Sequence, residues 1–149
     1  MKKMNCILLV DDSKSTNFYN KKLIEISGVA DQVFEAYNGL EALDYLNRTG
    51  KFEGGEDEFP RPNVIFLDIN MPKMDGFEFL EEYAKLPKER RGDILLAFLT
   101  TSNWEKDRIK AFEKEELVHD FIEKPLEEKT LKRVYEFYVS NPDFHIVDA

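Results

Sequence analysis

Short apolar runs alternate with longer amphipathic runs along this chain of 149 residues. The short runs have the length and side chains of buried strands, and they predict strands at 6–10, 32–37, 64–67, 94–99 and 118–123. The longer runs space their apolar residues as helices do, and they predict helices at 14–27, 39–50, 76–86, 104–116 and 127–140. Alternation of this kind is typical of βαβ units, in which a helix joins two parallel strands.

Five strands that alternate with five helices predict an α/β fold, with a parallel sheet covered by helices on both faces. Because crossovers between parallel strands are right-handed, we expect a doubly wound five-stranded sheet. In such sheets ligands bind beyond the carboxyl ends of the strands, where the strand order reverses. The chemistry of the protein is therefore expected at that edge.

The apolar positions of the first and last helices predict which side chains face the core. In the first helix they lie mostly on one face, which holds Phe18, Leu23 and Ile26. In the last helix the buried side is predicted to hold Leu131, Val134, Tyr135 and Tyr138.

Residues 51–63 are rich in glycine, proline and acids, and their apolar residues show neither helical nor strand spacing. This composition is typical of an extended loop, which either is a solvated excursion or shapes partner contacts near the site. We expect residues 1–140 to form one domain that includes this loop, followed by a short tail at 141–149 and no output domain.

Composition narrows the class of protein. A chain with 42% hydrophobic and 34% charged residues has the profile of a soluble globular protein. The apolar stretch Cys6–Val10 is shorter than the roughly 7–15 residues of a signal-peptide core. No apolar run approaches the roughly 20 residues of a membrane span. The single cysteine, Cys6, is interpreted as a small buried hydrophobe and agrees with a reducing, cytoplasmic location.

The net charge of −9 disfavours direct binding to nucleic acid or to an anionic membrane, because phosphate contacts need clustered lysine and arginine. One basic run exists, "KERR" at 88–91, but acidic residues surround it. We interpret this run as a solvated surface turn.

Polar residues that can carry chemistry follow four of the predicted strands. They are three acids, three hydroxyl residues and one lysine: Asp11, Asp12, Asp68, Thr100, Thr101, Ser102 and Lys124. Because the carboxyl ends of parallel strands share one edge, these side chains are expected to converge. Crowded carboxylates repel one another unless a cation neutralises them, and oxygen ligands suit Mg²⁺. The alternative is a set of surface acids that diverge into solvent.

Four motifs stand at these strand ends, "VDDS" (10–13), "DINMPKMDG" (68–76), "LTTS" (99–102) and "FIEKP" (121–125). In this order they resemble the receiver domain of two-component response regulators, of the single-domain type related to chemotaxis regulators. The resemblance runs from about Ile7 to Tyr138. It implies a flavodoxin-like (βα)5 fold. Asp75, inside the second motif, is expected to cap the third helix rather than to join the metal site.

The resemblance implies a role for each matching residue. Asp68 is similar to the aspartate that accepts a phosphoryl group from a histidine kinase or phosphotransfer protein. Asp12 resembles the direct ligand of Mg²⁺, or of another divalent cation such as Mn²⁺, and Asp11 its partner acting largely through water. Asp68 and the backbone carbonyl of Asn70 complete the metal ligands, and Lys124 pairs with the phosphoryl group.

Further positions resemble those that read and tune the phosphorylated state. Thr100 matches the switch hydroxyl, although "LTTS" leaves Thr101 as an alternative. Phe121 stands where the family has an aromatic rotamer switch, or it is simply a core aromatic. Asn70 and Ser102 match positions that tune the lifetime of the phosphoryl group by helping or blocking water.

The sequence therefore predicts a phosphorylatable signalling module in a phosphorelay, with at most self-phosphorylation and slow auto-dephosphorylation as catalysis. Its partners are expected to be a histidine kinase or phosphotransfer protein and an unknown downstream protein. It is expected to be a monomer or a weak dimer through the face of the fourth helix, fifth strand and fifth helix. A Mg²⁺-dependent phosphohydrolase would want an acid where Asn70 stands. A receiver that is never phosphorylated would lack the acids or the lysine.

Overall fold

The computed structural model describes residues 3–91, 94–101 and 117–141. The predicted helix at 104–116, Ser102 and all but the first residue of the predicted tail lie outside these ranges. The strands are Met4–Val10 (β1), Ala30–Ala36 (β2), Val64–Leu67 (β3), Leu95–Thr100 (β4) and Asp120–Glu123 (β5). The helices are Lys14–Ser27 (α1), Gly39–Asn47 (α2), Gly76–Tyr83 (α3), Lys88–Arg91 (α4) and Glu128–Ser140 (α6), with a 3₁₀ turn at Gly50–Phe52 (η1).

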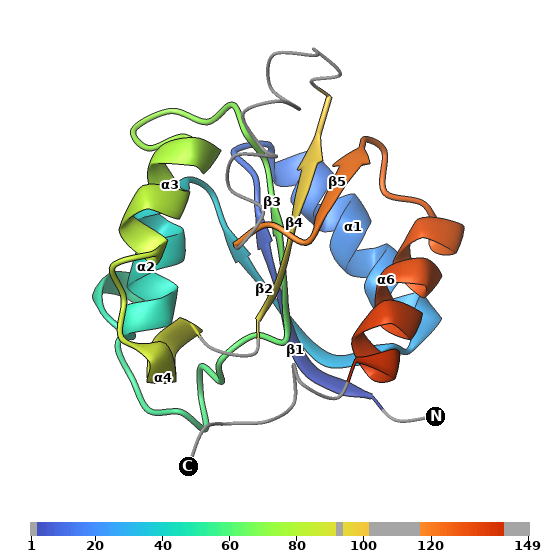
Figure 1. Cartoon of the computed structure of the whole chain (residues 1–149), viewed down its shortest axis with the longest axis horizontal. Helices are drawn as coiled ribbons and strands as arrows, with labels where there is room; N and C mark the ends of the chain where they lie inside the picture. Colours follow the sequence, from blue (N-terminus) through green and yellow to red (C-terminus); the bar gives the residue numbers. More distant parts are fainter. Residues whose placement is uncertain (1–2, 92–93, 102–116, 142–149) are drawn as a thin grey trace.

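The five strands form one parallel sheet in the order β2-β1-β3-β4-β5. Helices α1 and α6 cover one face, and α2 and α3 cover the other (Figure 1). The chain moves outward from β1 to β2 and then returns to place β3 on the other side of β1. The order therefore reverses between β1 and β3, as predicted for a doubly wound sheet.

The core has two layers, one on each face of the sheet. Along β1, Ile7 and Leu9 pack toward the side of α1 and α6, whereas Cys6, Leu8 and Val10 pack toward the side of α2 and α3. The central strands are buried on both faces, which explains why they read as continuous apolar runs instead of alternating ones. Cys6 is completely buried, which confirms its interpretation as a core residue.

Helix α1 has the predicted bounds. Of its predicted apolar face, Leu23 is half-buried and packs against the core, whereas the prediction was wrong for Phe18 and Ile26. Phe18 is 60% and Ile26 84% exposed, whereas the fully buried positions are Asn17, Asn20 and Ile24. These three are spaced by three and four residues, as a buried helical stripe requires, but two of them are polar. In α6 the prediction largely holds, because Leu131, Val134 and Tyr138 are buried and Tyr135 is half-buried.

The segment after α2 is exposed to solvent at residues 53–58, as a solvated excursion would be, and is packed against the protein at both ends. It begins with the turn η1, and Phe52 packs edge-on against Tyr45 with 5.1 Å between ring centroids. The Tyr45 hydroxyl donates to the Pro60 carbonyl at 2.7 Å. The Asn63 amide oxygen accepts from the Cys6 N–H at 3.0 Å, at the start of the sheet. The segment thus enters β3 at the end of the sheet opposite Asp68.

Two other local predictions change. The run "KERR" has no buried residue, as predicted for a solvated surface, but it forms the short helix α4 instead of a turn. Helix α3 ends at Tyr83, before the predicted 86. In the part of the chain that the structure describes, none of the helices is long and apolar enough to cross a membrane.

Candidate functional site

Three acids meet at the carboxyl edge of the sheet, as the strand ends predicted. Asp11 and Asp12 follow β1, and Asp68 follows the neighbouring strand β3. One carboxylate oxygen from each lies within 4.8 Å of the others. Asp11 and Asp68 are buried, and Asp12 is exposed. The acids converge instead of diverging into solvent, so the alternative of unrelated surface acids does not hold.

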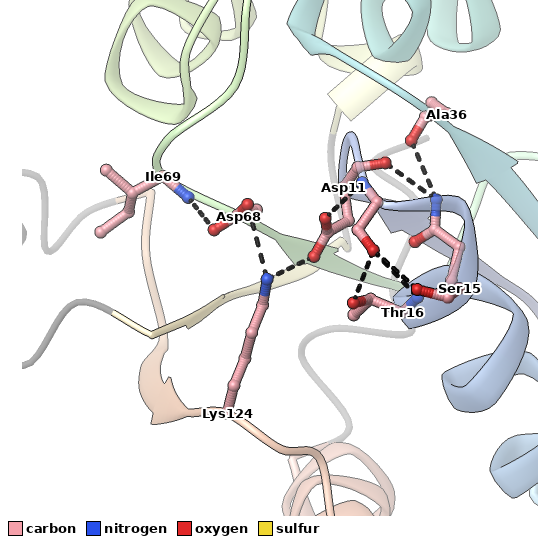
Figure 2. A network of polar contacts seen from close by, with 9 residues as sticks. Asp11, Ser15, Thr16, Ala36, Asp68, Ile69 and Lys124 are labelled. Carbon is pink, nitrogen blue, oxygen red and sulfur yellow. Dashed lines mark hydrogen bonds and ion pairs between the residues drawn. The ribbon is translucent and has the colours of Figure 1, made fainter.

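Lys124 extends from the end of β5 to this acidic cluster (Figure 2). Its ammonium nitrogen lies 2.5 Å from Asp11 Oδ2 and 3.5 Å from Asp68 Oδ2. Its backbone N–H donates to the Thr100 carbonyl at 2.8 Å, and the Lys124-Pro125 peptide bond is cis. One cation thus contacts two buried acids, and the contact with Asp11 is the closer one.

The charges around Asp68 are only partly balanced. Burial, and then the neighbouring Asp11 carboxylate, raise the pKa of Asp68, while Lys124 and the Ile69 N–H act in the opposite direction. That N–H donates to Asp68 Oδ1 at 2.9 Å. A single ammonium therefore leaves an excess of negative charge at a set of hard oxygen ligands. This donor set fits Mg²⁺ or Mn²⁺, which bind carboxylates, carbonyls and water.

The start of α1 holds Asp11 in place through two residues that the sequence analysis did not single out. Ser13 caps the helix, and its N–H donates to Asp11 Oδ1 at 2.8 Å. The buried amide of Asn17 donates to the Asp11 carbonyl at 3.0 Å and to the Ala36 carbonyl at 3.4 Å. The sequence signal that could have identified Asn17 is the helical spacing of Asn17, Asn20 and Ile24. A buried helical face that contains amides predicts polar partners for those amides.

The loop after Asp68 returns tightly into α3. A Cβ on Gly76 would lie 2.6 Å from the Asp68 carbonyl oxygen, so the two backbone segments approach more closely than a side chain permits. Asp75 caps α3, since its carboxylate accepts from the Glu78 N–H at 2.8 Å and the Glu78 carboxylate accepts from the Asp75 N–H at 3.1 Å. The prediction that Asp75 is a helix cap is confirmed.

The remaining predicted residues occupy different surroundings. Thr100 ends β4 and is fully buried, whereas Thr101 is exposed. Phe121 is half-buried in β5, and its ring lies 6.1 Å from that of Phe98, edge to face. Asn70 is exposed two residues beyond Asp68.

The response regulator receiver domain family model matches residues 7–136. Among curated proteins, the chain is 37% identical over 107 residues to the response regulator Rcp1 of Synechocystis, which covers 72% of this chain and 69% of Rcp1. The chain therefore belongs to the response regulator receiver family. It is a phosphoryl-accepting module of two-component signalling. The receiver domain generally acts as a signalling phosphoacceptor, and relatives that are enzymes, such as the protein-glutamate methylesterases, match this chain over less than a third of their own length.

Solved structures agree with this assignment. A two-component response regulator from Cytophaga hutchinsonii has a TM-score of 0.80 at 25% identity, over 94% of this chain and 100% of that one. The Mn²⁺-bound form of Rcp1 has a TM-score of 0.66 at 31% identity, over 97% of this chain and 96% of that one. The predicted α/β flavodoxin-like receiver fold is confirmed.

Proposed function

We propose that Asp68 is the phosphoacceptor, in a reaction that depends on a divalent cation bound beside it. The observation that carries this proposal is the convergence of Asp11, Asp12 and Asp68 within 4.8 Å, with the Lys124 ammonium in contact with two of them. No other group of three or more metal-binding acids, histidines or cysteines occurs in the described ranges.

The proposed reaction is the transfer of a phosphoryl group to the carboxylate of Asp68. An Asp68 oxygen attacks the phosphorus of the donor, the bond to the donor's leaving group breaks, and an acyl phosphate forms. A carboxylate and a phosphoryl group repel each other, so the positive charge near them lowers the barrier more than any covalent assistance does. Lys124 supplies one such charge and moves toward the new phosphoryl oxygens once they bear the negative charge.

A divalent cation would supply the other charge. Asp11, Asp12, Asp68 and the backbone carbonyl of Asn70 would hold it, with Asp12 a direct ligand and Asp11 acting largely through water. Mg²⁺ suits this set because it keeps several waters and takes one or two protein carboxylates. The known Mn²⁺-bound form of Rcp1 supports a divalent cation of this kind.

We propose Thr100, not Thr101, as the hydroxyl that binds the phosphoryl group. Neighbouring residues of a strand point to opposite faces, so Thr100 shares the face of Phe98, and Thr101 belongs to the other. Phe121 pairs with Phe98 in the β4–β5 register and lies on that same face. A movement of Thr100 toward a phosphoryl group would therefore change the packing around Phe121. This supports a role for Phe121 as a rotamer switch and not only as a core aromatic.

The phosphoryl donor is proposed to be a histidine kinase or a phosphotransfer protein, and the output a change in affinity for a downstream protein. The surface proposed to change, which is also the proposed face of any weak dimer, includes β5 and α6. Residues 104–116, which the sequence assigns to the same face, lie outside the described ranges. Asn70 and Ser102 are proposed to set the lifetime of the phosphoryl group. The buried single Cys6 supports a reducing, cytoplasmic location.

One experiment tests the acceptor. The protein is incubated with acetyl phosphate and Mg²⁺, and intact mass is followed beside Asp68→Asn and the surface control Asp31→Asn. We expect one phosphoryl group on the wild type and on Asp31→Asn, none on Asp68→Asn, and loss of labelling with EDTA. Labelling that survives Asp68→Asn would assign the acceptor elsewhere. Steady hydrolysis of many equivalents of acetyl phosphate would favour the phosphohydrolase.

A further inference from the structure

Five basic side chains gather at the end of the sheet opposite Asp68, in a protein of net charge −9. They come from the C-terminal cap of α2, the loop before β3, and α4: Arg48, Arg61, Lys88, Arg90 and Arg91. We call this set the arginine surface. Figure 1 shows α4 at the end of the sheet where the strands begin, with the arrowheads at the other end.

Three of these arginines are held by neutral acceptors. Arg48 Nε donates to the Phe59 carbonyl at 2.9 Å, and Arg91 Nε donates to the Leu86 carbonyl at 2.9 Å. Arg90 Nη1 donates to the Asn47 amide oxygen at 2.8 Å. Arg48, Arg90 and Arg91 form no ion pair with any residue that the structure describes. Their head groups are thus oriented, and within the described ranges no carboxylate forms an ion pair with them.

Arg48 and Arg90 line one small pocket together with Arg61. Its volume is about 20 Å³, and its apolar lining comes from Tyr45, Leu46, Phe59 and Pro62. A space of this size admits a group about as large as one water molecule, such as the end of a carboxylate. A guanidinium has five N–H donors, and Arg48 and Arg90 each direct one of them to the protein, so donors remain for a ligand.

We propose that the arginine surface binds an acidic segment of a partner protein, with one carboxylate in the pocket between Arg48, Arg61 and Arg90. Arginine is the side chain best suited to carboxylates because its planar fork matches their geometry. Glu89 also lines the pocket, and its backbone oxygen accepts from Arg61 Nη1 at 2.9 Å.

The whole-molecule charge favours a short acidic segment over other anionic occupants. Nucleic acid presents many phosphates at once, and a protein of net charge −9 repels them beyond the arginine surface. Two copies of this chain repel each other for the same reason. The position at the amino ends of the strands leaves the Asp68 edge free, so a partner held here stays bound while phosphoryl transfer takes place.

The test uses a fluorescein-labelled peptide, Glu-Glu-Leu-Glu-Glu, and its Lys-Lys-Leu-Lys-Lys counterpart in anisotropy titrations at low salt. We expect saturable binding of the acidic peptide only, weakened about fivefold by Arg90→Gln and by Arg48→Gln. Lys132→Gln on α6 changes the net charge equally and should leave binding unchanged. Phosphorylation by acetyl phosphate shows that each variant is folded.

Three results would overturn the proposal. The first is no saturable binding of the acidic peptide to the wild type. The second is an equal loss of peptide affinity in Arg90→Gln and Lys132→Gln, which would show that binding depends on net charge alone. The third is a different occupant: a labelled DNA duplex that binds more tightly than the peptide, or a dimer in sedimentation that Arg90→Gln dissociates.

Discussion

At the scale of single residues, the site is an arrangement of buried charge. Asp68 has a raised pKa because it is buried beside Asp11, and Lys124 compensates for only part of that cost. A group that is costly to keep ionised in the folded protein destabilises the fold whenever it is charged. The same charge is what attracts a divalent cation and a positive partner for the phosphoryl group.

Asp68→Asn is therefore expected to stabilise the protein against urea at pH 7 in EDTA, by roughly 1 kcal/mol. The physical reason is the loss of one of two neighbouring buried carboxylates. The measurement is the free energy of unfolding from urea titration, and the difference should shrink when Mg²⁺ is added. A variant that is less stable than the wild type in EDTA would show that Asp68 contributes favourably through Lys124 instead.

Cys6 offers a second test at this scale. Burial raises the pKa of its thiol to about 12, from an ordinary value of 9.0. We expect Ellman's reagent to react at pH 8 only after unfolding. The folded state holds the Cys6 thiol proton more tightly than the unfolded state does. The free energy of unfolding is therefore unaffected by this thiol below pH 9, and it falls as the pH rises from 9 toward 12. Rapid labelling of the native protein would show that the first strand opens locally.

At the scale of elements, α1 shows how a helix can be predicted correctly while its buried face is not. Its bounds depend on local features, the Ser13 cap and a left-handed Gly28. Its orientation depends on what lies beneath it. The carbonyls of Asp11 and Ala36 stand at the ends of two strands, and Asn17 satisfies both. The Ala36 carbonyl also accepts from the Asp11 N–H at 3.0 Å, so the Asp11 carbonyl is the group that depends on Asn17. Leaving that buried carbonyl without its donor would cost more than the exposure of Phe18 does.

Asn17→Ala is expected to lower the free energy of unfolding by about 2 kcal/mol, because it leaves the buried Asp11 carbonyl without the Asn17 donor. Phe18→Ala, at the neighbouring position, should change it by less than about 0.5 kcal/mol, because that ring is exposed. Thermal or urea unfolding of both variants makes the comparison. The reverse order of effects would restore the apolar face that the sequence predicted.

At the scale of the whole molecule, the sheet gathers chemistry from distant positions. The site draws on β1, β3, β4 and β5, and the strand order places two acids on adjacent strands at the reversal point. The opposite end of the sheet gathers basic charge instead. The two ends differ in charge, so a cation and an acidic partner need not compete for one surface.

Mg²⁺ is expected to raise the melting temperature, because a ligand that binds only the folded state stabilises it. At ten times its dissociation constant the gain is about 1.4 kcal/mol. Asp12→Asn should remove most of this gain, whereas Asp31→Asn, with the same change of charge far from the site, should retain it. Calorimetry with and without Mg²⁺ measures the effect. If both variants lost the Mg²⁺-dependent rise in melting temperature equally, the rise would reflect general screening of the net charge of −9.

The family and the site acids could be predicted from the sequence, because each depends on short motifs in chain order. Asp11, Asp12, Asp68 and Lys124 meet where a parallel sheet must bring them. The residues that position them were not predictable in this way. Ser13 stands in the motif "VDDS", but its backbone N–H is what contacts the Asp11 carboxylate. Asn17 lies outside the four motifs and acts on the backbone carbonyls of Asp11 and Ala36.

The chain's apolar pattern by itself determined the order of the five strands and of the helices α1, α2, α3 and α6, and its strand-end motifs determined the class of protein. Those features are local, and local spacing encodes them. Only the tertiary structure decided which face of α1 is buried, where the 51–63 segment lies, and that Lys124 contacts Asp11 more closely than Asp68. Only it gathered the arginines of three segments on one surface. The reason is physical: burial and charge depend on neighbours that are close in space and remote along the chain.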